Sequence, residues 1–242
     1  MQLSKLESKA YETLRNNNMA IFRSKDIMLL LGVSRAKSYN IIKALKRKKA
    51  ILALKAGLYA VSGTNELIAG SYLNWPSYLS FWSALSYYGF TDQLPKTIFY
   101  ASTKYRKKTN NYKYATISKK RFFGYTRIGG IIIAEKEKAI VDSLLFPKYA
   151  GGIKQLISSI ETSLKELDIG RLADYAVKME SKAVLRRLGF ILELIGFKGN
   201  ALRKISKKIG KGYERLEPSL GRRNNLNKRW LLDINDDINR RA

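Results

Sequence analysis

Cysteine and histidine are both absent from this chain of 242 residues. Without cysteine the chain can form no disulfide bond and no thiolate zinc site, and it has no cysteine nucleophile. Without histidine it has no imidazole base, which excludes the Ser-His-Asp triad and related mechanisms. We therefore expect no metal or other cofactor, and no enzyme built on these side chains.

Long apolar runs are missing as well. No run is long enough to span a bilayer, and the segment from Met1 to Arg15 lacks the apolar core of a signal peptide. The absence of cysteine is also typical of proteins from reducing compartments. Together these absences lead us to expect a cytoplasmic protein with no membrane partner.

Acidic residues are few. The chain has 46 Lys and Arg against 19 Asp and Glu, so its formal net charge is +27. A charge this high indicates a polyanionic partner, with nucleic acid ahead of an anionic membrane surface. Acidic residues are missing altogether between Asp26 and Glu66, between Asp92 and Glu135, and from Phe197 to Tyr213.

The first acid-free stretch has the pattern of a winged helix-turn-helix. A helix expected over residues 3–16 precedes it. Ser24 and Ser34 are placed to cap two further helices, and Gly32 suits the left-handed turn between them. Two short strands, 51–55 and 58–61, would then form the wing. We assign residues 1–63 to this domain.

The second of these helices carries the candidate DNA-binding residues. Its apolar positions recur at helical spacing, so one side should face the core and the other should be exposed. In a helix-turn-helix, the N-terminal part of this helix enters the major groove, where Arg, Lys and Asn can contact base edges. An ordinary helical hairpin with a solvated basic face is the alternative. The candidates are Ser34, Arg35, Lys37, Tyr39, Asn40, Lys43, Arg47 and Lys55.

Residues 64–242 are expected to form a larger α+β domain. A helix is predicted from Pro76 to about Tyr88, strands over 97–102, 112–118 and 123–134, and helices beyond Glu135. Tyrosines interleave with the basic residues of this second acid-free stretch. The pattern fits either a nucleic-acid surface or an antiparallel sheet with its tyrosines packed inside. The auxiliary basic surface comprises Arg106, Lys107, Lys108, Lys119, Lys120 and Arg121.

Several segments resemble the AbiEi-type antitoxins of type IV toxin–antitoxin systems, which are linked to abortive phage infection. They are Pro76-Ser77-Tyr78, Tyr88-Gly89-Phe90-Thr91, Phe122-Phe123-Gly124-Tyr125, 134–142 and Leu216-Glu217-Pro218. The resemblance implies that the winged helix represses its own operon by binding inverted repeats in the promoter. It also implies that the C-terminal domain counteracts a nucleotidyltransferase-like toxin. The resemblance brings no catalytic motif with it.

Other functions remain open on sequence grounds. The chain could be a stand-alone winged-helix regulator. It could also be an RNA-binding protein, which high charge and interleaved tyrosines would fit. A nuclease would need paired carboxylates, for which Glu135, Glu137 and Asp142 are the densest cluster. Those residues are more typical of a helix beginning with favourable glutamates. The oligomeric state is left open.

Overall fold

The computed structural model describes residues 2–105 and 111–238. The chain divides into two compact units, Met1–Trp75 and Pro76–Ala242. This division falls later than the junction expected after residue 63, because helix α4 (Glu66–Leu73) belongs to the first unit. The side chain of Lys55 donates a hydrogen bond of 2.8 Å to the carbonyl of Leu73 at the end of α4.

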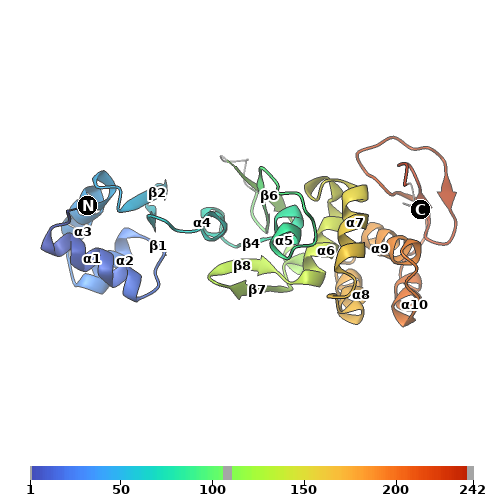
Figure 1. Cartoon of the computed structure of the whole chain (residues 1–242), viewed down its shortest axis with the longest axis horizontal. Helices are drawn as coiled ribbons and strands as arrows, with labels where there is room; N and C mark the ends of the chain where they lie inside the picture. The colour runs from blue at the N-terminus through green and yellow to red at the C-terminus, as the bar shows by residue number, and fades with distance from the viewer. Residues whose placement is uncertain (1, 106–110, 239–242) are drawn as a thin grey trace. The chain divides into compact units, whose positions relative to one another are not determined.

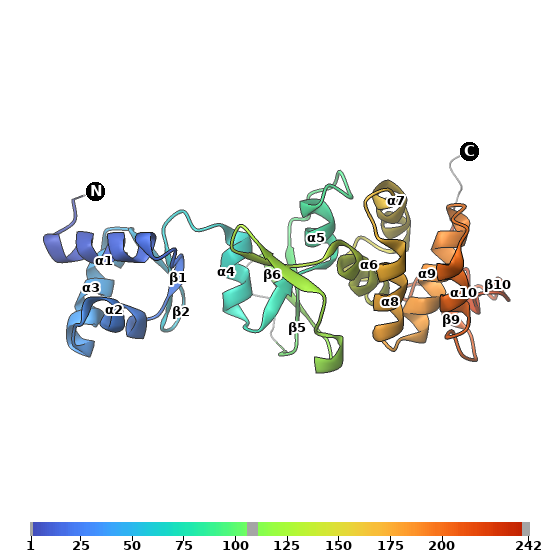
Figure 2. The same cartoon turned by 90° about the horizontal axis from the view of Figure 1, so that it is seen from below.

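The first unit has the order of elements expected of a winged helix (Figures 1 and 2). Its sheet has the strand order β1-β3-β2, and both pairs are antiparallel. This arrangement fits a winged helix-turn-helix, in which a hairpin follows the second helix of the motif. The elements are α1 (Lys5–Asn16), β1 (Ile21–Phe22), α2 (Ser24–Leu31), α3 (Arg35–Arg47), β2 (Ile51–Lys55), β3 (Leu58–Val61) and α4.

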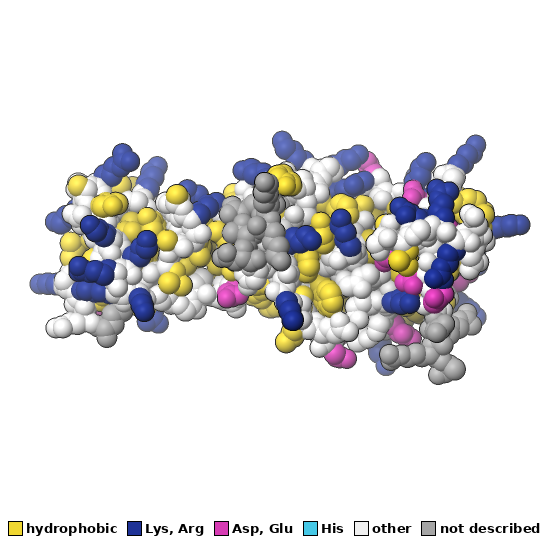
Figure 3. Space-filling view, turned by 90° about the horizontal axis from the view of Figure 1, so that it is seen from above, with side chains coloured by type: hydrophobic (Ala, Val, Ile, Leu, Met, Phe, Trp, Pro, Cys, Tyr) yellow, Lys and Arg dark blue, Asp and Glu magenta, His cyan; other side chains and the backbone are white. Residues whose placement is uncertain are grey.

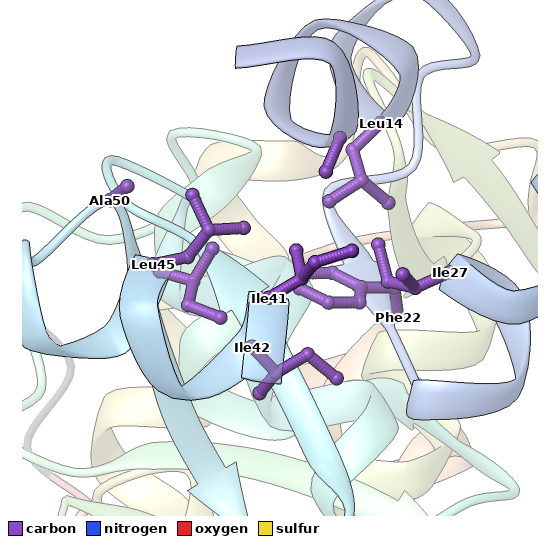
Figure 4. Packing of buried hydrophobic residues seen from close by; sticks show 9 residues of the cluster. Leu14, Phe22, Ile27, Ile41, Ile42, Leu45 and Ala50 are labelled. Carbon is purple, nitrogen blue, oxygen red and sulfur yellow. The ribbon is translucent and has the colours of Figure 1, made fainter. Parts of the chain in front are cut away.

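A single apolar cluster holds α1, α2 and α3 together (Figure 4). Leu14, Ile27 and Leu45 come from the three helices, and each is completely buried. Phe22 and Ile41 pack among them. Burying each large side chain stabilises the fold by about 1.5–3 kcal/mol. This core therefore fixes the position of α3 against α1 and α2.

The two expected caps have different outcomes. Ser34 does cap α3, accepting a 3.3 Å hydrogen bond from the backbone N–H of Lys37. Ser24, in contrast, is the first residue of α2 and caps nothing. Its hydroxyl and carbonyl instead lie 3.0 Å from the hydroxyl of Ser38, which is fully buried. This pair of serines joins α2 to α3, since a buried hydroxyl needs a partner.

The second unit is built on a five-stranded sheet of order β6-β5-β4-β8-β7. The sheet is mixed, so the antiparallel alternative is wrong: β4 pairs with β8 and β5 with β6 in parallel. The helix predicted from Pro76 is also wrong at its start, because Ser77–Leu79 form the central strand. The strands are β4 (Ser77–Leu79), β5 (Ile98–Ser102), β6 (Tyr112–Thr116), β7 (Tyr125–Ile128) and β8 (Ile131–Ala134).

Apart from one helix between β4 and β5, the helices of this unit follow the sheet along the chain, as predicted, and with the first unit they give the chain an α+β fold. The last helices lead into a small sheet of order β10-β11-β9. None of the described helices is long and apolar enough to cross a bilayer. The helices are α5 (Phe81–Tyr87), α6 (Lys136–Leu145), α7 (Ile153–Ser163), α8 (Ile169–Lys178), α9 (Lys182–Leu194) and α10 (Asn200–Ser206), and the small strands are β9 (Glu214–Arg215), β10 (Leu226–Asn227) and β11 (Leu232–Asp233).

Two buried contacts fasten the C-terminal segment to α9. The guanidinium of Arg187 donates to the carbonyls of Leu144, Arg215 and Leu216 at 2.8–3.0 Å. The indole of Trp230 is completely buried and lies directly over Gly189. A β-carbon at position 189 would come within 2.1 Å of that ring. Only glycine therefore leaves room for the tryptophan.

We expect Gly189→Ala to destabilise the second unit by at least about 1–3 kcal/mol, the usual cost of overpacking a filled core. Urea unfolding followed by tryptophan fluorescence measures this change. Gly221→Ala is the matched control, because no atom lies within 4 Å of the added methyl group there. Equal stabilities of the two variants would show that Trp230 does not occupy the position described.

Candidate nucleic-acid interface

The exposed side of α3 carries the candidate recognition residues in the expected arrangement. Ser38, Ile41, Ile42 and Leu45 are buried, which confirms the predicted core side. Because the opposite side must then face outward, its long polar side chains are available to a ligand. The exposed candidates are Ser34, Arg35, Lys37, Tyr39, Asn40, Lys43 and Arg47.

Shape and chemistry vary along this exposed side. Ala36 is small and exposed near the beginning of α3, so a ligand can approach the backbone closely there. Tyr39 stands beyond it with 63% of its surface exposed, which is unusual for a side chain of that size. Asn40 is exposed beside it and can form a bidentate pair with adenine, while Lys43 lies one turn further along.

The charge around α3 is almost entirely positive. No acidic residue occurs between Asp26 and Glu66. One basic residue is nevertheless neutralised, because the ammonium of Lys48 lies 2.5 Å from a carboxylate oxygen of Glu7 on α1. The hydrogen bond from Lys48 lowers the pKa of Glu7 below its ordinary value of 4.5. Lys46, Arg47 and Lys49 are exposed and remain available for phosphates, whereas Lys48 is not. On the face of the first unit shown in Figure 3, the charged side chains are almost all dark blue Lys and Arg.

Lys55 does not extend from the wing as expected. It ends β2, is half-buried, and binds the carbonyl of Leu73. The hairpin turn beyond it consists of Ala56 and Gly57, which carry no charge. The tip of the wing therefore carries no cation, and α3 supplies the positive charge of the first unit's candidate interface.

Only Lys119, Lys120 and Arg121 of the auxiliary basic surface lie within the described residues, and two of these three cations are bound to other groups of the protein. Lys119–Arg121 form a turn of 3₁₀ helix rather than part of the sheet. Arg121 donates to the carbonyl of Met179 at 2.8 Å, and Lys120 pairs with Glu180. Lys119 is exposed and forms no ion pair within the described residues. Arg106, Lys107 and Lys108 lie outside the residues that the structure describes.

The interleaved tyrosines mostly serve packing. Tyr100, Tyr112 and Tyr114 are buried, and the ring of Tyr100 lies 5.4 Å from that of Tyr114 in a stacked arrangement. Tyr105 is the exception, with 76% of its surface exposed. The inward tyrosines cannot stack on bases, so the packing alternative is the correct one for these three residues.

The acidic residues considered for a nuclease site, Glu135, Glu137 and Asp142, are each bound to a different group of the protein. Glu135 accepts a hydrogen bond from Tyr175, and Glu137 accepts one from the backbone N–H of Asp168. Asp142 is fully buried and paired with Lys138. No group of three or more acidic side chains that could hold a metal ion is found in residues 2–105 and 111–238.

One feature near the C-terminus was not predicted from the sequence. A hollow of about 350 Å³ lies between the end of α9, α10 and Arg229. Its walls come from segments more than twenty residues apart in the chain, such as Phe197 and Arg229. No local pattern could have predicted that they meet.

Comparison with known proteins identifies the fold and nothing beyond it. No protein-family model matches the sequence, and no curated protein matches it significantly. Among solved structures, the chain is similar to the crystal structure of the RV2827C protein from Mycobacterium tuberculosis, with a TM-score of 0.68 and 13% identity. The match covers 96% of this chain and 92% of that one. An identity this low carries no conclusion about activity.

Proposed function

We propose that this protein binds duplex DNA through α3 and regulates transcription, most directly as a repressor. The observation that carries the proposal is the exposed side of α3: base-contacting residues at its beginning, cations along its length, and no acidic residue between Asp26 and Glu66. A helix-turn-helix contacts DNA through this part of its second helix, and phosphate contacts supply most of the affinity. Inverted repeats in a promoter are the expected target.

The role of the second unit rests on the resemblance to AbiEi-type antitoxins. On that basis we propose that residues 76–242 counteract a nucleotidyltransferase-like toxin, and that the repressed operon encodes both proteins. The segments that carry the resemblance lie mainly in this unit, around the central strand β4 and helix α6. We propose no enzymatic role for the chain, since its densest carboxylates are each engaged with other side chains or backbone groups.

We expect the full chain to bind a duplex carrying the inverted repeat upstream of its own gene more tightly than a structured RNA of equal length. The reason is that the major groove of B-DNA admits a helix such as α3, whereas the major groove of an RNA helix is deep and narrow. Fluorescence anisotropy at fixed salt concentration measures both affinities. A preference for RNA would favour the RNA-binding alternative.

The variant that tests α3 is Arg35→Ala/Lys43→Ala, which removes two cations of that helix. Its matched control is Lys5→Ala/Lys9→Ala, which removes two exposed cations of α1. Only the first pair should weaken binding to the duplex beyond the general effect of lost charge. Equal losses in the two double variants would mean that α3 is not the interface.

A further inference from the structure

The hollow at the end of α9 combines an apolar wall, a carboxylate and a cationic rim. Phe197 and Leu202 supply the apolar surface, and Glu193 supplies the carboxylate. Lys198 and Arg203 are exposed at the hollow, and neither forms an ion pair with any residue in the described part of the chain. We call this feature the α10 hollow.

Glu193 is held rigidly in this wall. One of its oxygens pairs with Arg229, and the other accepts a hydrogen bond of 2.5 Å from the indole N–H of Trp230. An ionised carboxylate has about four acceptor positions, so it can still accept from a ligand. Arg229 balances the charge of Glu193, so the free acceptor positions of the carboxylate favour a ligand group that carries N–H donors over one that offers only acceptors.

The rim continues into a longer basic surface. Lys207, Lys208 and Lys211 follow α10 directly, and all three are exposed. No acidic residue occurs from Phe197 to Tyr213 to oppose them. Lys204 is different, because it pairs with Asp174 on α8. The unpaired cations are more numerous than a single phosphate requires, so they suit a chain of phosphates.

We propose that the α10 hollow binds single-stranded nucleic acid, with one base inside and the neighbouring phosphates on the basic rim. The ring of Phe197 supplies a surface for the base, as aromatic side chains do in single-strand-binding proteins. Glu193 accepts from the ring or amino N–H of the base, and Lys198 and Arg203 contact the flanking phosphates. An acidic protein surface fits less well, because its carboxylates carry no N–H donors for the free acceptor positions of Glu193. This site lies outside α3 and is independent of the proposed repressor function.

The test uses the full chain with Arg35→Ala/Lys43→Ala as background, so that the contribution of α3 is reduced and is the same in every variant compared. The probe is a fluorescein-labelled 12-nucleotide single strand of mixed sequence, titrated at several salt concentrations. Adding Lys198→Ala/Arg203→Ala should weaken binding about tenfold or more. It should also reduce the slope of log K against log salt by about 1.4, which corresponds to two phosphate contacts on a single strand. Adding Lys96→Ala/Lys165→Ala removes the same charge from exposed positions elsewhere in the unit and should change little.

Phe197→Leu separates stacking from charge. It should weaken binding of the strand while leaving the salt slope unchanged, and circular dichroism confirms that the variant is folded. Equal losses in the two charge variants, or no loss in either, would overturn the proposal. So would polyglutamate competing as well as an unlabelled single strand, because the hollow would then be a site for acidic proteins.

Discussion

Raising the salt concentration from 50 to 200 mM should weaken binding of the operator duplex by roughly 10²-fold. Each phosphate neutralised on B-DNA contributes about 0.9 to the slope of log K against log salt. Four exposed cations behind the base-contacting beginning of α3 are placed for phosphates, and together they would give a slope of about 3.6 per protomer. The four are Lys43, Lys46, Arg47 and Lys49.

Variants identify which cations are responsible. Lys43→Ala/Lys46→Ala should reduce the slope by about 1.8, since two phosphate contacts are lost. Lys48→Ala should leave the slope unchanged, because that ammonium is already paired with Glu7. A binding constant that hardly varies with salt would contradict the phosphate-contact model. A full effect of Lys48→Ala would contradict the pairing.

Asp142→Ala should destabilise the second unit by about 3–5 kcal/mol, the cost of leaving a buried charge without its partner. Asp142 and Lys138 are both completely buried one turn apart on α6. The hydroxyls of Tyr78 and Ser80 donate to the same carboxylate at 2.9 and 2.8 Å. Burial lowers the pKa of Lys138 below its ordinary value, although Asp142 opposes this shift.

A second variant shows whether the unpaired charge causes the loss. Lys138→Met/Asp142→Leu replaces the pair by apolar side chains and should recover most of the stability, because well-packed apolar residues often replace a buried ion pair at little cost. Urea unfolding followed by the fluorescence of Trp82 and Trp230, both in this unit, measures each variant. If the double variant were no more stable than Asp142→Ala, the loss would have to come from the bonds of Tyr78 and Ser80.

Local signals in the sequence were enough to predict most of the first unit, although they indicated neither β1 nor α4. Helix α3, both strands of the hairpin and the cap at Ser34 follow from apolar spacing, turn residues and charge within about thirty residues. The cap expected at Ser24 was wrong because a tertiary partner, Ser38, takes its hydroxyl. Arg23 takes the capping position instead, with its backbone N–H bound by Asp26 at 2.6 Å.

Sequence patterns predicted the second unit less well, because its structure depends on strands and side chains that pair over long distances in the sequence. Ser77–Leu79 looked helical because Pro76 can begin a helix, yet the segment lies between β5 and β8 as the central strand. The cations of the auxiliary surface looked equivalent. Arg121 is nevertheless bound to a carbonyl at the end of α8, fifty-eight residues away, and no local pattern reveals such a partner.

The most direct measurement of the central claim is the affinity of α3 variants for the operator duplex and for a scrambled duplex of the same length. Arg35→Ala and Asn40→Ala should each reduce the preference for the operator by about 1–3 kcal/mol, because they remove contacts to base edges. Lys43→Ala should weaken both duplexes alike and leave the preference intact, because it removes a phosphate contact. If all three variants lowered the two affinities equally, α3 would not be the element that recognises sequence.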